Sequence, residues 1–193
     1  MSELFDIPVA EARAEMLALL RAVAYEEGDF TLASGKKSKY YIDGRRVTMH
    51  PRGAVLTGLL FWEEIRDLVP AEGPFGISGL TMGADPVITA TALVAAARGH
   101  ELYPFYCRKE AKGHGAGRQL EGYYDGVASC VLVEDTATTG RSILKAAAAV
   151  EAAGVRPVAG ILLVDREEGA REAIEEAGLA FRAVFSVREL QSG

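Results

Sequence analysis

The sequence lacks the features that mark membrane-spanning and secreted proteins. No apolar run approaches the roughly 20 residues that a transmembrane helix needs. The 193 residues include only two cysteines, Cys107 and Cys130, and both lie in apolar stretches, which argues against a disulfide framework. The chain starts with Met1-Ser2-Glu3, which does not resemble a signal peptide. We therefore expect a cytoplasmic protein without a membrane partner.

The sequence also lacks an excess of positive charge. Its net charge is −6, whereas binding to nucleic acid needs a basic surface, so nucleic acid is not an expected partner. Positive charge is instead gathered locally, in residues 36–46 and in residues 108–118. Solvated surface charge explains either cluster alone equally well. Together they indicate a small and highly anionic ligand.

Several common motifs are missing. Gly35-Lys36-Lys37-Ser38 has neither the upstream glycine nor the following helix of a nucleotide-binding P-loop, and no apolar helix follows Gly113 to Gly117 as in a dinucleotide loop. His50, His100 and His114 share no metal-ligand spacing. No Gly-x-Ser-x-Gly elbow occurs, although a Ser-His-Asp arrangement stays open. We therefore expect no P-loop, no dinucleotide-binding loop and no zinc site.

What is present is an alternation of strand and helix patterns, in a chain long enough for one domain with a real core. Asp85 and Pro86 are expected to supply an N-cap and a first-turn proline. Strands are predicted over 30–32, 40–42, 74–80, 101–107, 127–133, 157–164 and 181–187, and helices over 9–25, 51–68, 85–97, 143–154 and 168–177. This order implies an α/β fold, with a central parallel sheet flanked by helices. The glycine-rich residues 109–124 are interpreted as a loop that acts as a lid.

The most specific pattern covers residues 131–142. An apolar strand leads to Glu134 and Asp135, then to the small residues Thr136-Ala137-Thr138-Thr139-Gly140, and then to a helix. Ligands of α/β sheets bind at the carboxyl ends of strands, and N–H groups at a helix start bind phosphate. Two carboxylates would repel a phosphate unless they face something else, such as sugar hydroxyls or a metal. The alternative is an ordinary strand-to-helix turn.

This pattern resembles the phosphoribosyl pyrophosphate signature of the type I phosphoribosyltransferases. Four further stretches occur in order along residues 30–169. Residues 30–43 resemble the amino-terminal signature of the orotate phosphoribosyltransferases, and 108–115 resemble their mobile catalytic loop. Residues 165–169 resemble their third signature, and 79–86 resemble the loop beside the pyrophosphate. The chain is therefore identified as a member of this family.

The resemblance implies the fold and the reaction. The fold is that of a type I phosphoribosyltransferase in one domain over residues 1–193, with a small N-terminal hood, mainly 1–45, and a catalytic loop at about 108–122. The enzyme would transfer ribose 5-phosphate from phosphoribosyl pyrophosphate to orotate, giving orotidine 5′-monophosphate and pyrophosphate, in de novo pyrimidine (UMP) biosynthesis. A homodimer in which the catalytic loop reaches the neighbouring subunit's site is also implied.

The resemblance also assigns the site residues. Lys109, Lys112, His114 and Asp135 would be catalytic, because cations stabilise a departing pyrophosphate. Orotate would be bound by Tyr40, Tyr41, Thr138 and Arg166, with Arg166 suited to the carboxylate and only one tyrosine facing the base. Phosphoribosyl pyrophosphate would be bound by Arg108, Lys109, Lys112, His114, Glu134, Asp135, Thr136, Ala137, Thr138, Thr139, Gly140, Arg141 and Ser142. The cofactor would be Mg²⁺, held mainly by pyrophosphate and water rather than directly by protein ligands.

Two positions depart from the family pattern. Ala33 stands where many relatives carry lysine, and Arg141 stands where a small residue is common, so that it either contacts phosphate or points to solvent. Two alternatives stay open. A purine phosphoribosyltransferase would not need Arg166 for a carboxylate. A non-catalytic sensor of phosphoribosyl pyrophosphate usually carries a nucleic-acid-binding surface, which an acidic chain of this length has little room for.

Overall fold

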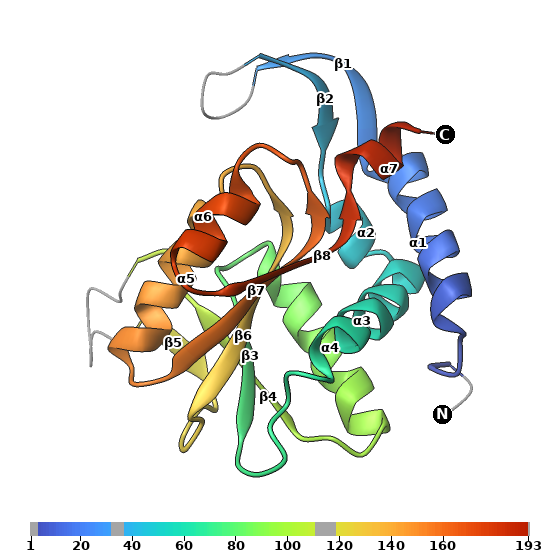
Figure 1. Cartoon of the computed structure of the whole chain (residues 1–193). Coiled ribbons are helices and arrows are strands. Elements are labelled where there is room, and N and C mark those ends of the chain that lie inside the picture. Colours follow the sequence, from blue (N-terminus) through green and yellow to red (C-terminus); the bar gives the residue numbers. More distant parts are fainter. Residues whose placement is uncertain (1–3, 32–36, 111–118, 193) are drawn as a thin grey trace.

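The computed structural model describes residues 4–31, 37–110 and 119–192, and Figure 1 shows a central sheet with helices on both faces and a hairpin above it. The helices are α1 (Val9–Val23), α2 (Arg45–Thr48), α3 (Pro51–Ile65), α4 (Ala84–Ala97), α5 (Arg141–Ala152), α6 (Ala170–Glu176) and α7 (Val187–Gln191). The strands are β1 (Tyr25–Thr31), β2 (Lys37–Ile42), β3 (Phe75–Ser78), β4 (Leu102–Cys107), β5 (Leu120–Gly122), β6 (Ser129–Ala137), β7 (Arg156–Asp165) and β8 (Ala180–Ser186).

The main sheet has the strand order β5-β4-β3-β6-β7-β8. All neighbouring pairs are parallel except β4 and β5, which are antiparallel. From β3 the chain continues outward to β4 on one side, and it returns to β6 on the other side. The order of the strands therefore reverses between β3 and β6, which is where ligands bind in open α/β sheets.

The core lies in two layers, one on each face of the sheet. Successive residues of β6 alternate between them: Val131 and Val133 pack in the cluster that includes α1, α3 and α4, whereas Cys130 and Leu132 pack in the cluster that includes α5 and α6. Both faces are therefore apolar, as the unbroken hydrophobic run in the sequence indicates. Cys107 and Cys130 are buried free thiols.

The hairpin of β1 and β2, called the hood hairpin below, stands above the carboxyl-terminal edge of the sheet (Figure 1). It is antiparallel and pairs Tyr25 with Ile42, and the N–H of Asp43 donates to the carbonyl oxygen of Ala24 at 3.0 Å. Because β2 leads straight into α2, the base of the hairpin is held close to the ends of β3 and β6. Within the described parts of the chain, no helix combines the length and hydropathy needed to cross a bilayer.

The strand-and-helix alternation is confirmed, and four local predictions are wrong. The sheet is not wholly parallel, because β5 forms inside the glycine-rich segment that was expected to be a loop. Strand β6 continues past Val133 to Ala137, so the acidic pair lies within the strand. Asp85 is not an N-cap, since α4 begins at Ala84 with Gly83 as its cap. Gly28, which the sequence suggests as the end of the first helical region, lies inside β1. The short helices α2 and α7 were not predicted, because segments of four and five residues show no periodicity.

Candidate active site

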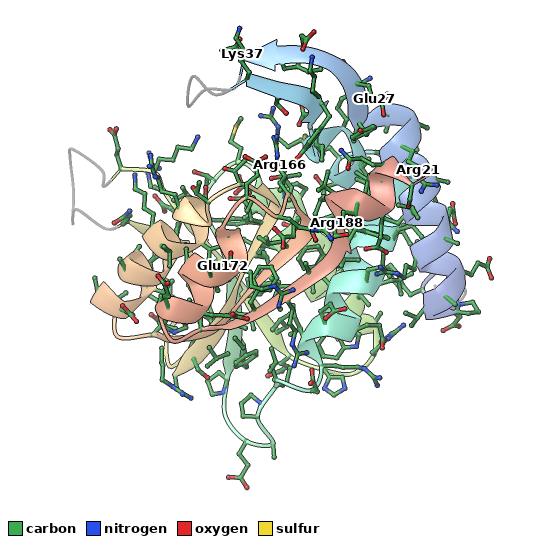
Figure 2. All side chains as sticks on the ribbon, turned by 45° about the horizontal axis from the view of Figure 1, so that its top comes forward. Arg21, Glu27, Lys37, Arg166, Glu172 and Arg188 are labelled. Atoms are coloured by element: carbon green, nitrogen blue, oxygen red, sulfur yellow. The ribbon has the colours of Figure 1, made fainter. Side chains whose placement is uncertain are left out.

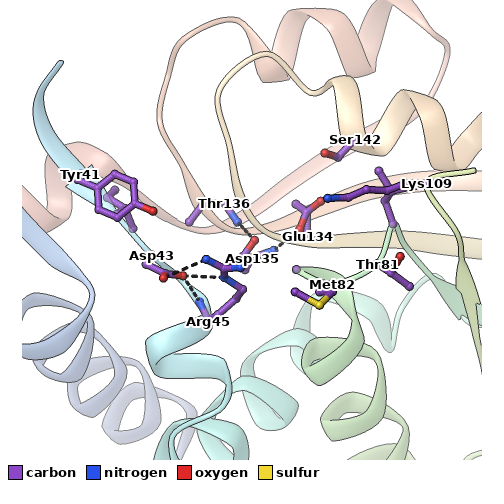
Figure 3. A pocket seen from close by; sticks show the side chains of 13 residues that line it. Tyr41, Asp43, Arg45, Thr81, Met82, Lys109, Glu134, Asp135, Thr136 and Ser142 are labelled. Atoms are coloured by element: carbon purple, nitrogen blue, oxygen red, sulfur yellow. Dashed lines mark hydrogen bonds and ion pairs between the residues drawn. The ribbon is translucent and has the colours of Figure 1, made fainter. Parts of the chain in front are cut away.

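A cleft of about 270 Å³ opens at the carboxyl ends of β3 and β6, and Figure 3 shows the side chains that line it. Four segments far apart in the sequence meet there. Three of them follow strands that end at the same edge of the main sheet: the loop after β3, Lys109 just beyond β4, and the junction of β6 and α5. The fourth is the junction of β2 and α2 at the base of the hood hairpin. The lining residues are Tyr41, Ile42, Asp43, Arg45, Leu80, Thr81, Met82, Gly83, Lys109, Glu134, Asp135, Thr136 and Ser142.

Two adjacent buried carboxylates, Glu134 and Asp135, form the floor of the cleft, with only 6% and 8% of each residue exposed. Because they belong to a strand, Asp135 follows Val133 toward the α2 side and Glu134 follows Leu132 toward the α5 side. The backbone N–H of Asp135 donates to Glu134 Oε1 at 3.2 Å, and that of Thr136 donates to Asp135 Oδ1 at 2.8 Å. Strand geometry therefore spreads the pair across the cleft.

Burial dominates the ionisation of this pair. It raises the pKa of Glu134 well above its ordinary value, and the neighbouring charge of Asp135 raises it further. Burial also raises the pKa of Asp135, against the lowering effect of hydrogen bonds from Glu134 and from the Thr136 N–H. Since two adjacent buried carboxylates cannot both ionise cheaply, the arrangement favours a proton on Glu134 shared with Asp135. Such a pair can accept hydrogen bonds from hydroxyl groups without the full repulsion of two anions.

Two glycines allow the backbone to approach the carboxylates closely. A Cβ atom on Gly83 would lie 2.1 Å from Glu134 Oε1, and one on Gly44 would lie 2.8 Å from Asp135 Oδ2. Any side chain at these positions would push a carboxylate out of place. The pair is thus held between the loop after β3 and the start of α2.

The loop from β6 to α5 ends at a helix start beside the cleft. Gly140 is the N-cap residue of the twelve-residue α5, in a left-handed conformation with φ of 69°. Thr138 is half-buried and Arg141 is exposed, whereas Ser142 lines the cleft. The unpaired N–H groups of a helix start, together with the hydroxyl groups of the loop, suit a phosphate.

Arg166 lies beneath the hood hairpin (Figure 2), in the loop after β7, and its side chain is only 6% exposed. Its backbone N–H donates to the Ala137 carbonyl oxygen at 3.2 Å, which places it beside the end of β6. Its Nε donates to Glu168 Oε1 at 3.0 Å and its Nη2 to Ser38 Oγ at 3.3 Å. The guanidinium also lies over the ring of Tyr40.

The two tyrosines of β2 point in different directions, as the alternation of a strand requires. Tyr40 faces Arg166, whereas Tyr41 lines the cleft and packs against Phe30 with 5.6 Å between ring centroids. Burial raises the pKa of the Tyr40 hydroxyl, which lies 3.3 Å from Glu168 Oε1. The cleft and the Arg166 site are thus joined through one strand of the hood hairpin.

The expected cations have different positions. Lys109 lines the cleft, and its ammonium group points toward Glu134 (Figure 3). Arg108 instead contacts Glu121 of β5, with 3.3 Å between Nη1 and Oε1. Lys112 and His114 lie outside the described residues, as does Ala33.

Residues of the cleft that were not assigned from the sequence are Ile42, Asp43, Arg45, Leu80, Thr81, Met82 and Gly83. The peptide bond between Thr81 and Met82 is cis. The sequence carried a signal for the residues at the junction of β2 and α2, because Arg45 belongs to the first basic cluster. It also carried one for the loop after β3, because residues 79–86 resemble the loop beside the pyrophosphate. What the sequence did not indicate was that both groups face the acidic pair.

Comparisons with known proteins agree with this geometry. A scan against protein-family models finds no match. The orotate phosphoribosyltransferase of Nostoc sp. is 42% identical over 185 residues, which cover 95% of this chain and 87% of that protein. The enzyme of Corynebacterium glutamicum is 43% identical over 181 residues, covering 94% and 95%. The crystal structure of Mycobacterium tuberculosis orotate phosphoribosyltransferase in complex with 5-phospho-α-D-ribosyl 1-diphosphate has a TM-score of 0.75 and 37% identity, covering 93% of this chain and 99% of that one.

The similarity extends over nearly the full length of each relative, and it includes both the hood hairpin and the sheet. Identities above 40% over more than nine tenths of this chain leave no other family to consider. The chain belongs to the orotate phosphoribosyltransferase family and has the type I phosphoribosyltransferase fold.

Proposed function

We propose that this chain transfers ribose 5-phosphate from phosphoribosyl pyrophosphate to orotate, releasing pyrophosphate. The observation that carries the proposal is the buried pair Glu134 and Asp135 in a cleft at the switch point between β3 and β6, beside the start of α5. The pair suits the two ribose hydroxyls. The helix start suits the 5-phosphate, through Thr136, Ala137, Thr138, Thr139, Gly140, Arg141 and Ser142.

In this proposal Arg166 binds the carboxylate of orotate. Its Nε and Nη2 are engaged by Glu168 and Ser38, which fixes the plane of the guanidinium and leaves N–H groups of the other nitrogen to face a ligand. Tyr40 supports the guanidinium from one side, and Tyr41 and Thr138 are assigned to orotate from the family resemblance. Because orotate is already an anion with an acidic ring N–H, no strong general base is needed.

Departure of pyrophosphate needs positive charge at the leaving oxygens. We assign this role to Lys109 in the cleft and, from the family resemblance, to Arg108, Lys112 and His114. The carboxylates of Asp43, Glu134 and Asp135 line the cleft and carry the type of oxygen that Mg²⁺ prefers. They are not arranged as a metal cage, since no three His, Cys, Asp or Glu side chains of the described residues are placed to hold an ion together. This donor set fits an ion held mainly by pyrophosphate oxygens and water. When bound, Mg²⁺ would neutralise charge on the pyrophosphate.

The test is a direct assay of orotate consumption. Orotate absorbance should fall in the presence of phosphoribosyl pyrophosphate and Mg²⁺, and it should stay constant when either is omitted or when Asp135→Asn replaces the wild type. An unchanged orotate signal, with hypoxanthine consumed instead, would overturn the substrate assignment. Binding of phosphoribosyl pyrophosphate without turnover of any base would favour the sensor alternative.

We further propose a homodimer. Met49 and Met82 are 70% and 64% exposed and line one groove with Pro86, and Leu93 follows two turns later on the same face of α4. Light scattering should report a dimer for the wild type and a monomer for Leu93→Asp. A wild-type monomer would contradict the proposal.

A catalytic loop shared between subunits can be tested by mixing variants. Lys112→Ala and Asp135→Asn should each be inactive alone, and a mixed dimer should recover activity, because one of its two sites then has an intact loop and an intact ribose site. No recovery in confirmed heterodimers would show that each loop serves its own subunit.

We propose that residues 1–193 act as one domain, with the hood over 1–45 and the catalytic loop over about 108–122. We also propose a cytoplasmic location, since Cys107 and Cys130 are buried free thiols, as is usual in a reducing compartment. Cell fractionation followed by immunodetection checks the location.

A further inference from the structure

We propose that Arg45 binds the pyrophosphate group of phosphoribosyl pyrophosphate and that Asp43 is the positioning residue that orients it. The inference rests on the proposed function and deepens it, because it gives a specific role to one cation of the first basic cluster, on the hood side of the cleft.

Arg45 is fixed in a defined geometry. It is the first residue of α2, and its Nε and Nη2 donate to Asp43 Oδ1 and Oδ2 at 2.9 and 3.1 Å. The two planar groups therefore meet in a fork, which holds the guanidinium in one plane. The Arg45 side chain is 44% exposed, twice the 22% of Asp43, so the open side of the fork is the arginine side.

The fork leaves donors for a ligand. A guanidinium has five N–H groups, and Asp43 engages one edge of it. Nη1 of Arg45 has no hydrogen-bond partner within residues 4–31, 37–110 and 119–192. Asp43 therefore orients Arg45 without using all of its donors.

The position of Arg45 matches the place where the pyrophosphate must lie. If the acidic pair holds the ribose 2- and 3-hydroxyls and α5 holds the 5-phosphate, then C1 and its pyrophosphate extend away from α5. Asp135 points to this opposite side, against Gly44, and Arg45 follows Gly44 directly. Figure 3 shows Arg45 on one side of the acidic pair and Lys109 on the other.

Charge in the cleft supports the same assignment. Its described lining contains three carboxylates, Asp43, Glu134 and Asp135, and two cations, Arg45 and Lys109. A ligand with several phosphate charges needs both cations, because the carboxylates otherwise repel it. Lys109 alone would leave the α2 side of the cleft negative.

Arg46 provides a matched control. It follows Arg45 in the same helix and also forms an ion pair, but its partner is Glu26 of β1 at 2.8 Å, and it does not line the cleft. Both arginines line the groove of Met49 and Met82, so Arg46→Gln also controls for an effect on that surface. Arg45→Gln and Arg46→Gln remove the same charge from adjacent positions, and only the first is expected to affect the ligand. Melting temperature and light scattering should establish that both variants keep the fold and oligomeric state of the wild type.

The experiment is calorimetric titration of each variant with phosphoribosyl pyrophosphate, with pyrophosphate plus Mg²⁺, and with ribose 5-phosphate. Arg45→Gln should lower the affinity for the first two ligands by about ten- to a hundred-fold, which is what a hydrogen bond to a charged group contributes. Its affinity for ribose 5-phosphate should equal that of the wild type. Arg45→Lys should have an affinity between those of the wild type and Arg45→Gln, because it keeps the charge and loses the two-point contact with Asp43. Arg46→Gln should bind all three like the wild type.

The outcomes separate this inference from the function. The role of Arg45 would be overturned if Arg45→Gln lost as much affinity for ribose 5-phosphate as for pyrophosphate, or if it lost affinity for none of the three ligands. Either result would leave the proposed function intact. Failure of the wild type to bind phosphoribosyl pyrophosphate would overturn both. Asp43→Asn should lower the affinity for pyrophosphate when it is introduced into the wild type. It should cause no further loss when it is added to Arg45→Gln, since a positioning residue acts only through its partner. Additive losses would show that Asp43 acts independently.

Discussion

The guanidinium carbon of Arg166 lies 4.7 Å from the centroid of the Tyr40 ring, in a cation–π contact that joins the hood hairpin to the loop after β7. The two residues come from opposite ends of the chain, and Ser38 of the same strand, 128 residues away from Arg166 in sequence, accepts a hydrogen bond from Nη2 of the arginine. The hood hairpin therefore fixes the position of the proposed orotate ligand as well as covering the cleft.

We predict that Tyr40→Leu raises KM for orotate by up to about ten-fold, because a cation–π contact at a partly buried site is worth about 1 kcal/mol or more. KM for phosphoribosyl pyrophosphate should not change. Tyr40→Phe keeps the ring and should behave like the wild type in the same steady-state assay. If Phe is as damaging as Leu, the hydroxyl contact with Glu168 rather than the ring is what matters.

Lys109 is predicted to act on the leaving group. Lys109→Ala should lower kcat by about 10²–10³, the usual cost of removing one donor from a developing negative charge. Lys145→Ala removes the same charge from an exposed position on α5 and serves as the control. Single-turnover kinetics should show the loss in the chemical step; an effect on product release alone would contradict this role.

Glu134→Gln is predicted to stabilise the ligand-free protein while abolishing activity. Burial raises the pKa of Glu134 well above its ordinary value, so the folded protein holds a proton that the unfolded chain releases above about pH 4.3. As pH rises above that value, the wild type should lose about 1.4 kcal/mol of stability per pH unit relative to the variant, until the pKa of the folded state is reached.

The check is a series of melting temperatures at several pH values without substrates. Near pH 4 the two proteins should melt alike, since Glu134 is then protonated in both states, and the advantage of Gln should grow as pH rises. A difference that stays constant with pH would mean that the carboxyl is not held protonated in the fold.

Gly83→Ala is predicted to damage function more than stability. The new Cβ would lie 2.1 Å from Glu134 Oε1, which is the tip of a flexible side chain and can move aside. Moving it displaces the group that binds the ribose, so affinity for phosphoribosyl pyrophosphate should fall while the melting temperature stays close to that of the wild type. A large fall in melting temperature with unchanged affinity would contradict this.

Gly58→Ala is predicted to do the opposite. A Cβ there would lie 2.5 Å from the backbone oxygen of Ala90, at the contact between α3 and α4, and a backbone atom cannot move aside without shifting the helix. Overpacking of this kind costs about 1–3 kcal/mol, measurable as a lower midpoint in chemical denaturation. The fraction that stays folded should keep the affinity of the wild type for phosphoribosyl pyrophosphate.

Much of this architecture could be predicted from residue patterns. The apolar run before Glu134 identifies a buried strand, and the small residues from Thr136 to Gly140 identify the turn into a helix, because both signals are local in the chain. The prediction that the strand ends at Val133 is wrong for a physical reason: the acids are shielded by Gly44 and Gly83, and these approach from other segments. The same holds for Asp85, whose place inside α4 depends on the path of the loop before it.

By itself the sequence determined the α/β alternation, the acidic pair and the family, since apolar period, turn residues and motif order need no knowledge of distant contacts. Only the tertiary structure decided that Arg45 and Lys109 face one cleft while Arg108 turns to β5, and that Tyr40 rather than Tyr41 meets Arg166. These relationships depend on how the hood hairpin closes over the sheet. Side-chain direction at such a junction is set by packing between segments far apart in the sequence, which local patterns do not encode.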